Sequence, residues 1–237
     1  MKKGQITIFI TIGIVLFITF LIVFFVRSDL IKKGINIGEK VDPNLVPLKK
    51  QVDECLRLTS EDGANLLGAQ GGHIFLRSGT YLDTEYSDIS ILYTANKPIK
   101  LDKIRLEQEF NDYMKDALLI CLDDFKNLKN SGMDIKYGTP KFNTKINEKN
   151  VEVNLNFNVV LTKQGKAYKL NTFLYTLPIK LGFLIDAVNN ILEGQVGKRS
   201  RASILSQYDI NTTAFYYEDH LIYALDDNDY DFIFAVR

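Results

Sequence analysis

The chain has 237 residues, of which 29 are basic and 29 acidic, so its formal net charge is zero. All of the acidic residues lie in residues 28–237, which therefore have a small negative charge. The absence of a basic surplus and of long charged blocks argues against a nucleic-acid partner and against a disordered charged tail.

The first element is an uncharged apolar segment, residues 6–26. As a helix it would be about 31 Å long, which matches a hydrocarbon core of about 30 Å. A secretory signal has a shorter apolar run followed by a small-residue cleavage site, and a buried core helix is rarely apolar on all sides. We therefore expect a single transmembrane helix, with the lipid bilayer as the partner of residues 6–26.

The basic residues on the two sides of this segment are nearly balanced in number, so the positive-inside rule does not set its orientation. The motif formed by the residues before the segment suggests the orientation instead. Lys2, Lys3, Gly4 and Gln5 followed by an apolar helix resemble the class III (type IV prepilin-like) signal of archaeal surface proteins. In that family a membrane peptidase cuts on the cytoplasmic side, after the glycine. The resemblance implies cleavage between Gly4 and Gln5, and a carboxyl-terminal domain outside the cell.

Longer stretches of the chain carry a second resemblance. The opening KKGQITIFITIGIVLF, together with CLRLTSEDGANLLGAQGG and YMKDALLICLDDF, is similar to uncharacterised membrane-anchored proteins of small-genome archaea. That group implies a location at the cytoplasmic membrane and no particular activity.

A type IV pilin-like filament subunit is the alternative for the same amino terminus. Many pilins have a glutamate at the fifth mature position, and this chain has Phe9 there. Two glycines and two prolines between residues 34 and 47 also interrupt the helix that a pilin continues into its head domain. We therefore expect an anchor over residues 1–27, including the signal, and a tether over residues 28–46.

Residues 47–237 are expected to form one extracellular α+β domain with about three helices and an antiparallel sheet. Apolar residues three or four apart predict a first helix from about residue 47 to Gly68, and residues 73–94 predict short strands. A second helix is predicted from the N-cap Asp102 to a stop at Gly132. The alternation of VEVNLNFNV predicts the middle strand of a meander. The remaining expected elements are strands at 140–146 and 167–179, a helix at 181–193, and strands at 209–217, 220–225 and 230–236.

Cys55 and Cys121 lie on the apolar stripes of the first and second predicted helices. Outside the cell, an even number of cysteines favours a disulfide between these helices. Two unpaired buried cysteines are the alternative. A zinc site is not expected, because neither cysteine has a CxxC or nearby histidine partner.

No catalytic, cofactor or metal site is predicted. His73 and His220 lack the HExxH spacing, and no GxSxG, SxxK or phosphate-loop motif occurs. Asp227, Asp229 and Asp231 begin like a calcium loop, but Phe232 follows where the loop needs glycine, so a hairpin turn is the better interpretation.

One sequon, Asn211-Thr212-Thr213, makes Asn211 a candidate for glycosylation in an exported chain. The expected function is a structural or interaction role at the cell surface, with other cell-surface proteins as partners. Besides the pilin, an envelope enzyme is the other alternative, with an acid/base pair drawn from residues such as Glu85, Asp88 or His73.

Overall fold

The structure is a computed structural model that describes residues 42–94, 97–196, 208, 210–227 and 230–237. These residues belong to a unit that begins at Val41. The predicted transmembrane segment, residues 6–26, lies outside the described part. Within that part, no helix has the length and apolarity needed to span a bilayer.

Helix α2, Val46–Ala69, confirms the first predicted helix, with a proline in its first turn. This helix contacts α3 (Lys103–Leu122), β7 (Lys166–Leu177) and β10 (Asp231–Val236), so it packs against both sheets of the domain. The helix ends where Gly71 and Gly72 adopt φ values of +69° and +94°. The amide of Gly72 then donates to the carbonyl of Leu67 at 2.7 Å, which satisfies an otherwise open helix carbonyl.

Helix α3, Lys103–Leu122, begins as predicted, because the side chain of Asp102 accepts a hydrogen bond of 3.0 Å from the amide of Ile104. The prediction that the same helix continues to Gly132 was wrong. A short 3-10 turn, η1 (Asp123–Phe125), and a separate helix, α4 (Lys126–Asn130), follow α3.

The break after α3 is a left-handed turn in which Asp123, Asp124 and Phe125 have φ values of 43°, 52° and 54°. Such values are unfavourable for residues other than glycine. The turn is compensated by burial, since it directs Phe125 into the core with no exposed surface. There the Phe125 ring lies 6.5 Å from the ring of Phe157 and 5.4 Å from that of Tyr137.

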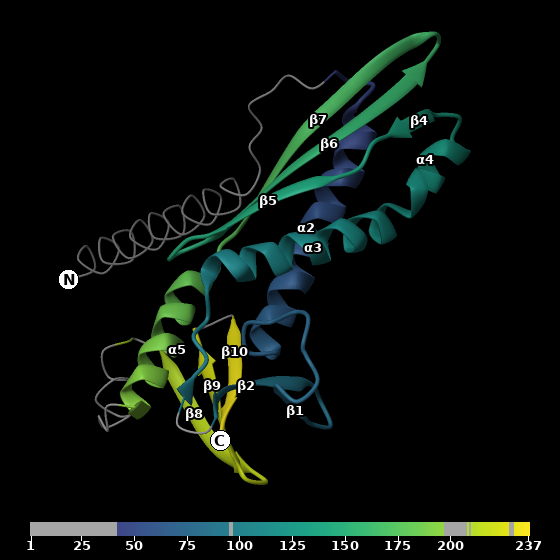
Figure 1. The fold of residues 1–237 in the computed structure, drawn as a ribbon. Helices are drawn as coiled ribbons and strands as arrows, with labels where there is room; N and C mark the ends of the chain where they lie inside the picture. Colours follow the sequence, from purple (N-terminus) through teal and green to yellow (C-terminus); the bar gives the residue numbers. More distant parts are fainter. Residues whose placement is uncertain (1–41, 95–96, 197–207, 209, 228–229) are drawn as a thin grey trace, which may run out of the picture. The chain divides into compact units, whose positions relative to one another are not determined.

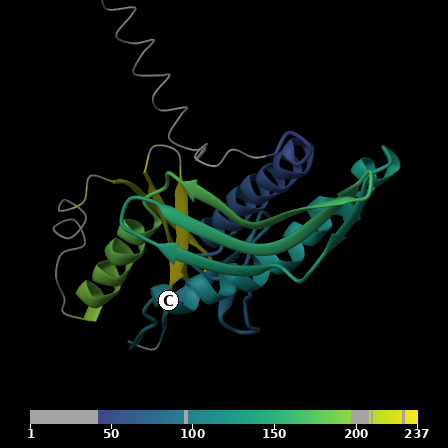
Figure 2. The same cartoon turned by 90° about the horizontal axis from the view of Figure 1, so that it is seen from above.

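The first sheet consists of β4 (Asp134–Tyr137), β5 (Lys141–Ile146), β6 (Val151–Lys163) and β7 (Lys166–Leu177). All of its pairs are antiparallel, and β6 is central, with β7 on one side and β4 and β5 on the other. The predicted meander is therefore confirmed, whereas the short strand β4 was not predicted. Helices α2 and α3 cover one face of this sheet (Figures 1 and 2).

The free edge of β5 is covered by side chains of α3. The amide of Thr144 donates to Asn111 Oδ1 at 3.0 Å, and the amide of Ile146 donates to Glu107 Oε1 at 2.8 Å. These bonds occupy amides that could otherwise pair with a strand of another chain.

The second sheet has the strand order β1-β2-β10-β9-β8, with β3 paired to β2. Only β2 and β10 are parallel, through the partners Ile91 and Ala235. The expectation of one antiparallel sheet was therefore wrong, because the described residues form two sheets and one is mixed. Alternation along a strand indicates which residues face the core, but it does not indicate the direction of a partner distant in sequence. The strands are β1 (Tyr81–Asp83), β2 (Asp88–Thr94), β3 (Lys97–Pro98), β8 (Asn211–Tyr217), β9 (His220–Asp226) and β10 (Asp231–Val236).

Helix α5, Leu181–Val196, confirms the third predicted helix and makes hydrogen bonds to the β5–β6 turn and to the loop before α3. The amide of Gly182 donates to the carbonyl of Asn147 in the β5–β6 turn at 3.2 Å. The side chain of Asn189 exchanges two hydrogen bonds, of 2.8 and 2.9 Å, with the backbone of Leu101. One continuous hydrophobic core includes residues of both sheets and of α2, α3 and α5.

Candidate functional site

Cys55 and Cys121 form a disulfide, with their Cα atoms 5.7 Å apart, as predicted. The bond joins α2 to α3, and Cys55 is buried between them. Among the described residues, no group of three or more histidine, cysteine or acidic side chains could hold a metal ion. The disulfide is therefore a structural cross-link in this domain.

The His73 side chain contacts Glu109 of α3, a residue that the sequence did not single out. His73 Nδ1 lies 3.2 Å from Glu109 Oε1, and Arg105 Nε donates to the same oxygen at 3.2 Å. The amide of Ile74 donates to Glu109 Oε2 at 3.1 Å. Burial raises the pKa of Glu109, but these bonds, that from His73 foremost, outweigh it and hold the pKa below its ordinary value.

The contacts of Glu109 make it an anchor for the loop after α2. A carboxylate held in its charged form is a poor proton donor at neutral pH. An open cleft of about 370 Å³ lies beside it, lined by residues that include Phe75, Arg77 and Arg105, but by no histidine, serine or cysteine. The structure thus places His73 against Glu109, and not against Glu85 or Asp88.

His220 begins β9, close to its predicted position at the start of a strand, and it is buried. Its Nδ1 lies 2.8 Å from Asp219 Oδ1, but neither ring nitrogen makes a hydrogen bond of good geometry with a described residue. In the suggested calcium loop, Asp227 is almost fully buried and accepts a bond of 2.7 Å from Lys180. Asp229 lies outside the described residues.

Asn211, the glycosylation candidate, is exposed at the start of the edge strand β8. An attached glycan would therefore meet solvent there. The proposed cleavage junction, Gly4 and Gln5, lies outside the part of the chain that the structure describes.

The outward face of the first sheet is a polar surface that the sequence analysis did not identify. We call it the lysine–asparagine face, and its side chains alternate with the buried side chains of the same strands. Neighbouring strands contribute lysines, amides and hydroxyls to it. Its exposed members are Asp134 and Lys136 of β4, Lys141, Asn143 and Lys145 of β5, Asn154, Asn156 and Asn158 of β6, and Lys169, Thr172 and Leu174 of β7.

The polar side chains of this face have no partners among the residues that the structure describes. Other lysines of the domain form ion pairs, such as Lys103 with Asp186 at 2.8 Å and Lys49 with Asp53 at 2.5 Å. The exposed lysines and asparagines of the lysine–asparagine face make no ion pair or side-chain hydrogen bond with any described residue. The alternation of VEVNLNFNV predicted an exposed row, but only the strand register brings the lysines beside it.

No protein-family model matches the chain, and no curated protein or solved structure is similar enough to match it. The function is therefore inferred from the residues themselves.

Proposed function

We propose that this chain is a single-pass membrane protein with its α+β domain outside the cell, where it has a structural or interaction role and no catalytic one. The observation that carries the proposal is the Cys55–Cys121 disulfide. Disulfides persist in oxidising compartments and are rare in the cytosol, where thiols are kept reduced. The cross-link therefore indicates an extracytoplasmic location for the folded domain.

The anchor is supported by residues 6–26, which contain no charged side chain. A bilayer requires length, apolarity and a helix that satisfies its own backbone hydrogen bonds. The proposed tether, residues 28–46, connects this segment to the domain. A domain that is tethered in this way can meet other molecules of the cell surface.

A non-catalytic role is supported by the environments of the two histidines. His73 is held against the charged Glu109, and the cleft beside this pair is lined by no serine, cysteine or histidine. His220 is buried next to Asp219. Neither histidine is arranged as a general base beside a nucleophile in an open site.

The location of the domain is tested by trapping thiols in intact cells. Cells are treated with an alkylating reagent before lysis, and the chain is examined on a non-reducing gel. We expect unmodified cysteines and the faster mobility of a cross-linked chain, with the double variant Cys55→Ala/Cys121→Ala as the control of slower mobility. Alkylation of both wild-type cysteines would place the domain in a reducing compartment and refute the proposal.

The anchor is tested by a double substitution, Leu16→Lys/Phe17→Lys, at the centre of the apolar segment. A lysine at the centre of a membrane helix costs about 3 kcal/mol on insertion scales, so two should abolish stable insertion. We expect wild type to remain in membranes after carbonate extraction and the double variant to be released. Leu58→Lys, at an exposed position of α2, is the control and should remain in the membrane. Release of the wild type would refute the anchor.

A further inference from the structure

We propose that the lysine–asparagine face binds an acidic polysaccharide, a chain of sugars that carry carboxylates. The inference rests on the proposed function, because such polymers lie outside the cell. It names the partner class of an interaction domain and adds no catalytic step.

The register of the strands places charges and hydrogen-bonding groups in rows across the sheet. One row joins Lys141, Asn156 and Thr172, and the next joins Asn143, Asn154 and Leu174. Strands lie about 4.8 Å apart, and side chains on one face repeat about every 7 Å along a strand. The face thus offers a regular array of donors and acceptors to an extended polymer.

A third row concentrates the positive charge, because Lys136 of β4 and Lys169 of β7 both pair with Val160 of β6. Two acidic residues occupy outward positions that pair across these strands: Glu152, opposite Lys145, and the exposed Asp134, opposite Thr162. Four lysines against one glutamate and one aspartate leave a surplus of two positive charges. A polyanion that neutralises this surplus releases its bound counterions, which favours binding.

The asparagines distinguish this face from a simple cluster of charge. Asn154, Asn156 and Asn158 follow one another along β6, and each side chain is exposed. Each amide offers two donors and an acceptor. Sugar hydroxyls both donate and accept, so these amides suit a hydroxylated chain between the lysine contacts.

The composition of the face makes other macromolecules poorer partners. The aromatic residues of these strands, such as Phe142 and Tyr168, pair with the buried side of β6, so none stacks with bases on the outward side. A protein interface needs a central apolar or aromatic anchor, and Leu174 is the one exposed large apolar side chain on this face. Membrane binding by a protein surface likewise relies on inserted apolar groups.

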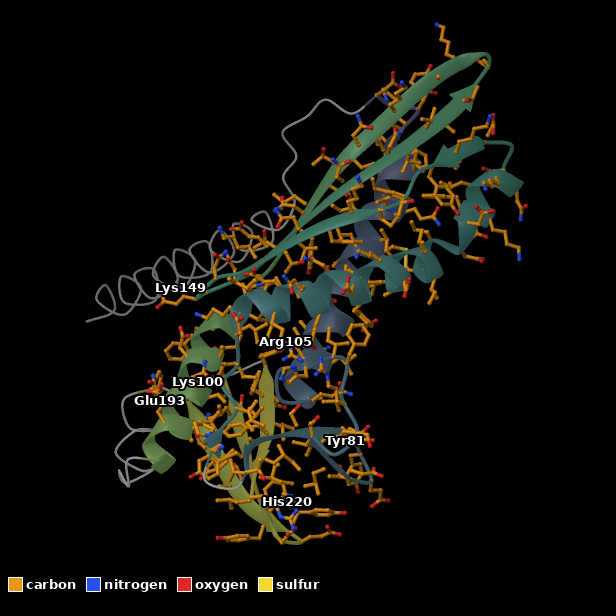
Figure 3. All side chains as sticks on the ribbon, in the orientation of Figure 1. Tyr81, Lys100, Arg105, Lys149, Glu193 and His220 are labelled. Atoms are coloured by element: carbon orange, nitrogen blue, oxygen red, sulfur yellow. A yellow bond between two sulfur atoms is a disulfide. The ribbon has the colours of Figure 1, made fainter. Side chains whose placement is uncertain are left out.

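The position of the face leaves it accessible to a polymer. Helices α2 and α3 cover the opposite side of the sheet (Figure 2). Lys149, in the turn between β5 and β6, lies at one end of the sheet (Figure 3), where the exposed Glu148 beside it offsets its charge.

The test uses the full chain purified in a neutral detergent and measures its affinity for polygalacturonate, a polymer of uronic acid. Neutral dextran, phosphatidylglycerol vesicles and single-stranded DNA are the comparison ligands. The key variant, Lys136→Gln/Lys141→Gln/Lys169→Gln, removes three charges from the face. The matched control, Lys50→Gln/Lys97→Gln/Lys126→Gln, removes three exposed lysines elsewhere that form no ion pair with described residues. Thermal melting confirms that each variant is folded.

We expect the face variant to bind polygalacturonate at least ten-fold more weakly, with a salt dependence smaller by about two in log–log slope. The control triple variant should bind within two-fold of wild type. Asn154→Ala/Asn156→Ala, with unchanged charge, should weaken binding at least three-fold. These results together would support the inference.

Four outcomes would overturn it. They are no preference for polygalacturonate over dextran, equal loss in both triple variants, unchanged binding by the asparagine variant, or tighter binding to vesicles or DNA. Because the assay uses purified protein, it is independent of the thiol-trapping experiment. A domain found outside the cell that does not bind would disprove only the polysaccharide, whereas a reduced domain inside the cell would disprove the proposed function.

Discussion

Removing the Cys55–Cys121 disulfide should destabilise the domain by about 4 kcal/mol. The two cysteines are 66 residues apart in the sequence, so the bond closes a long loop in the unfolded chain. In the chain-entropy model the loss of freedom for a loop of this length is worth about 4 kcal/mol at room temperature. That is a large fraction of the 5–15 kcal/mol that typically separates folded from unfolded domains.

The measurement is urea unfolding of the full chain in detergent, followed by near-ultraviolet circular dichroism. The chain has 12 tyrosines and no tryptophan, and every tyrosine lies at or beyond Tyr81, so the tyrosine band of this spectrum reports the domain and not residues 6–26. Three samples are compared: the oxidised wild type, the same protein with a reductant, and Cys55→Ala/Cys121→Ala. The reduced wild type keeps both sulfur atoms, so it isolates the cross-link from the packing of Cys55.

The entropic reasoning makes a kinetic prediction as well. Suppose that the bond acts by constraining the unfolded chain, and that α2 and α3 are already packed together in the folding transition state. Reduction should then mainly slow folding. A loss of less than about 1 kcal/mol on reduction would refute the argument. It would mean that the reduced, unfolded chain already keeps the two helices together.

Four further predictions follow from individual contacts. Gly68→Ala should destabilise the domain by about 3 kcal/mol in the same urea assay, because the added Cβ would lie 2.2 Å from the backbone oxygen of Asp231. Gly138→Ala is the control and should cost less than about 1 kcal/mol. Ser60→Ala should raise the unfolding free energy by about 1 kcal/mol, because the buried Ser60 hydroxyl has no hydrogen-bond partner; a loss of stability would show that the hydroxyl is satisfied. Glu109→Gln should cost about 2 kcal/mol at pH 7. The pKa of Glu109 is lower in the folded state than its ordinary value of 4.5. The stability that its charge contributes is therefore present above pH 4.5 and is lost as the pH falls through the folded pKa. The unfolding curves of wild type and Glu109→Gln should thus converge in acid, with Glu148→Gln as an unchanged control. Finally, intact-mass analysis of protein from the native host should find a chain that begins at Gln5; a chain that begins at Met1 or Lys2 would leave an uncleaved anchor.

Local signals in the sequence identified most of the elements of the domain. The stripe through Cys55 predicted α2, the N-cap Asp102 predicted the start of α3, and the alternation of residues 151–159 predicted β6. The disulfide followed from the same stripes, because two helices that pack through their apolar faces bring residues on those faces together. Each of these signals depends on neighbours a few residues apart.

The features that were missed depend on contacts between distant residues. The left-handed turn at Asp123, Asp124 and Phe125 is stabilised by the burial of Phe125 against Phe157, which no local pattern reveals. The contact of His73 with Glu109 requires the packing of the loop after α2 on α3. The lysine–asparagine face arises only after three strands align beside β6.

The position of β10 between β2 and β9 has a consequence for secretion. In the proposed topology the domain is exported from its anchored end onward, so Cys55, β2 and Cys121 reach the outside well before β10. The helix pair can therefore be cross-linked while β2 still lacks its parallel partner, and the open edge of β2 persists until Ala235 emerges to pair beside Ile91. During that interval the unpaired strand can associate with other chains. The order of events during export is therefore the cross-link first and the completed sheet last, and a pause in translocation after Cys121 lengthens the exposure of β2 without delaying the disulfide.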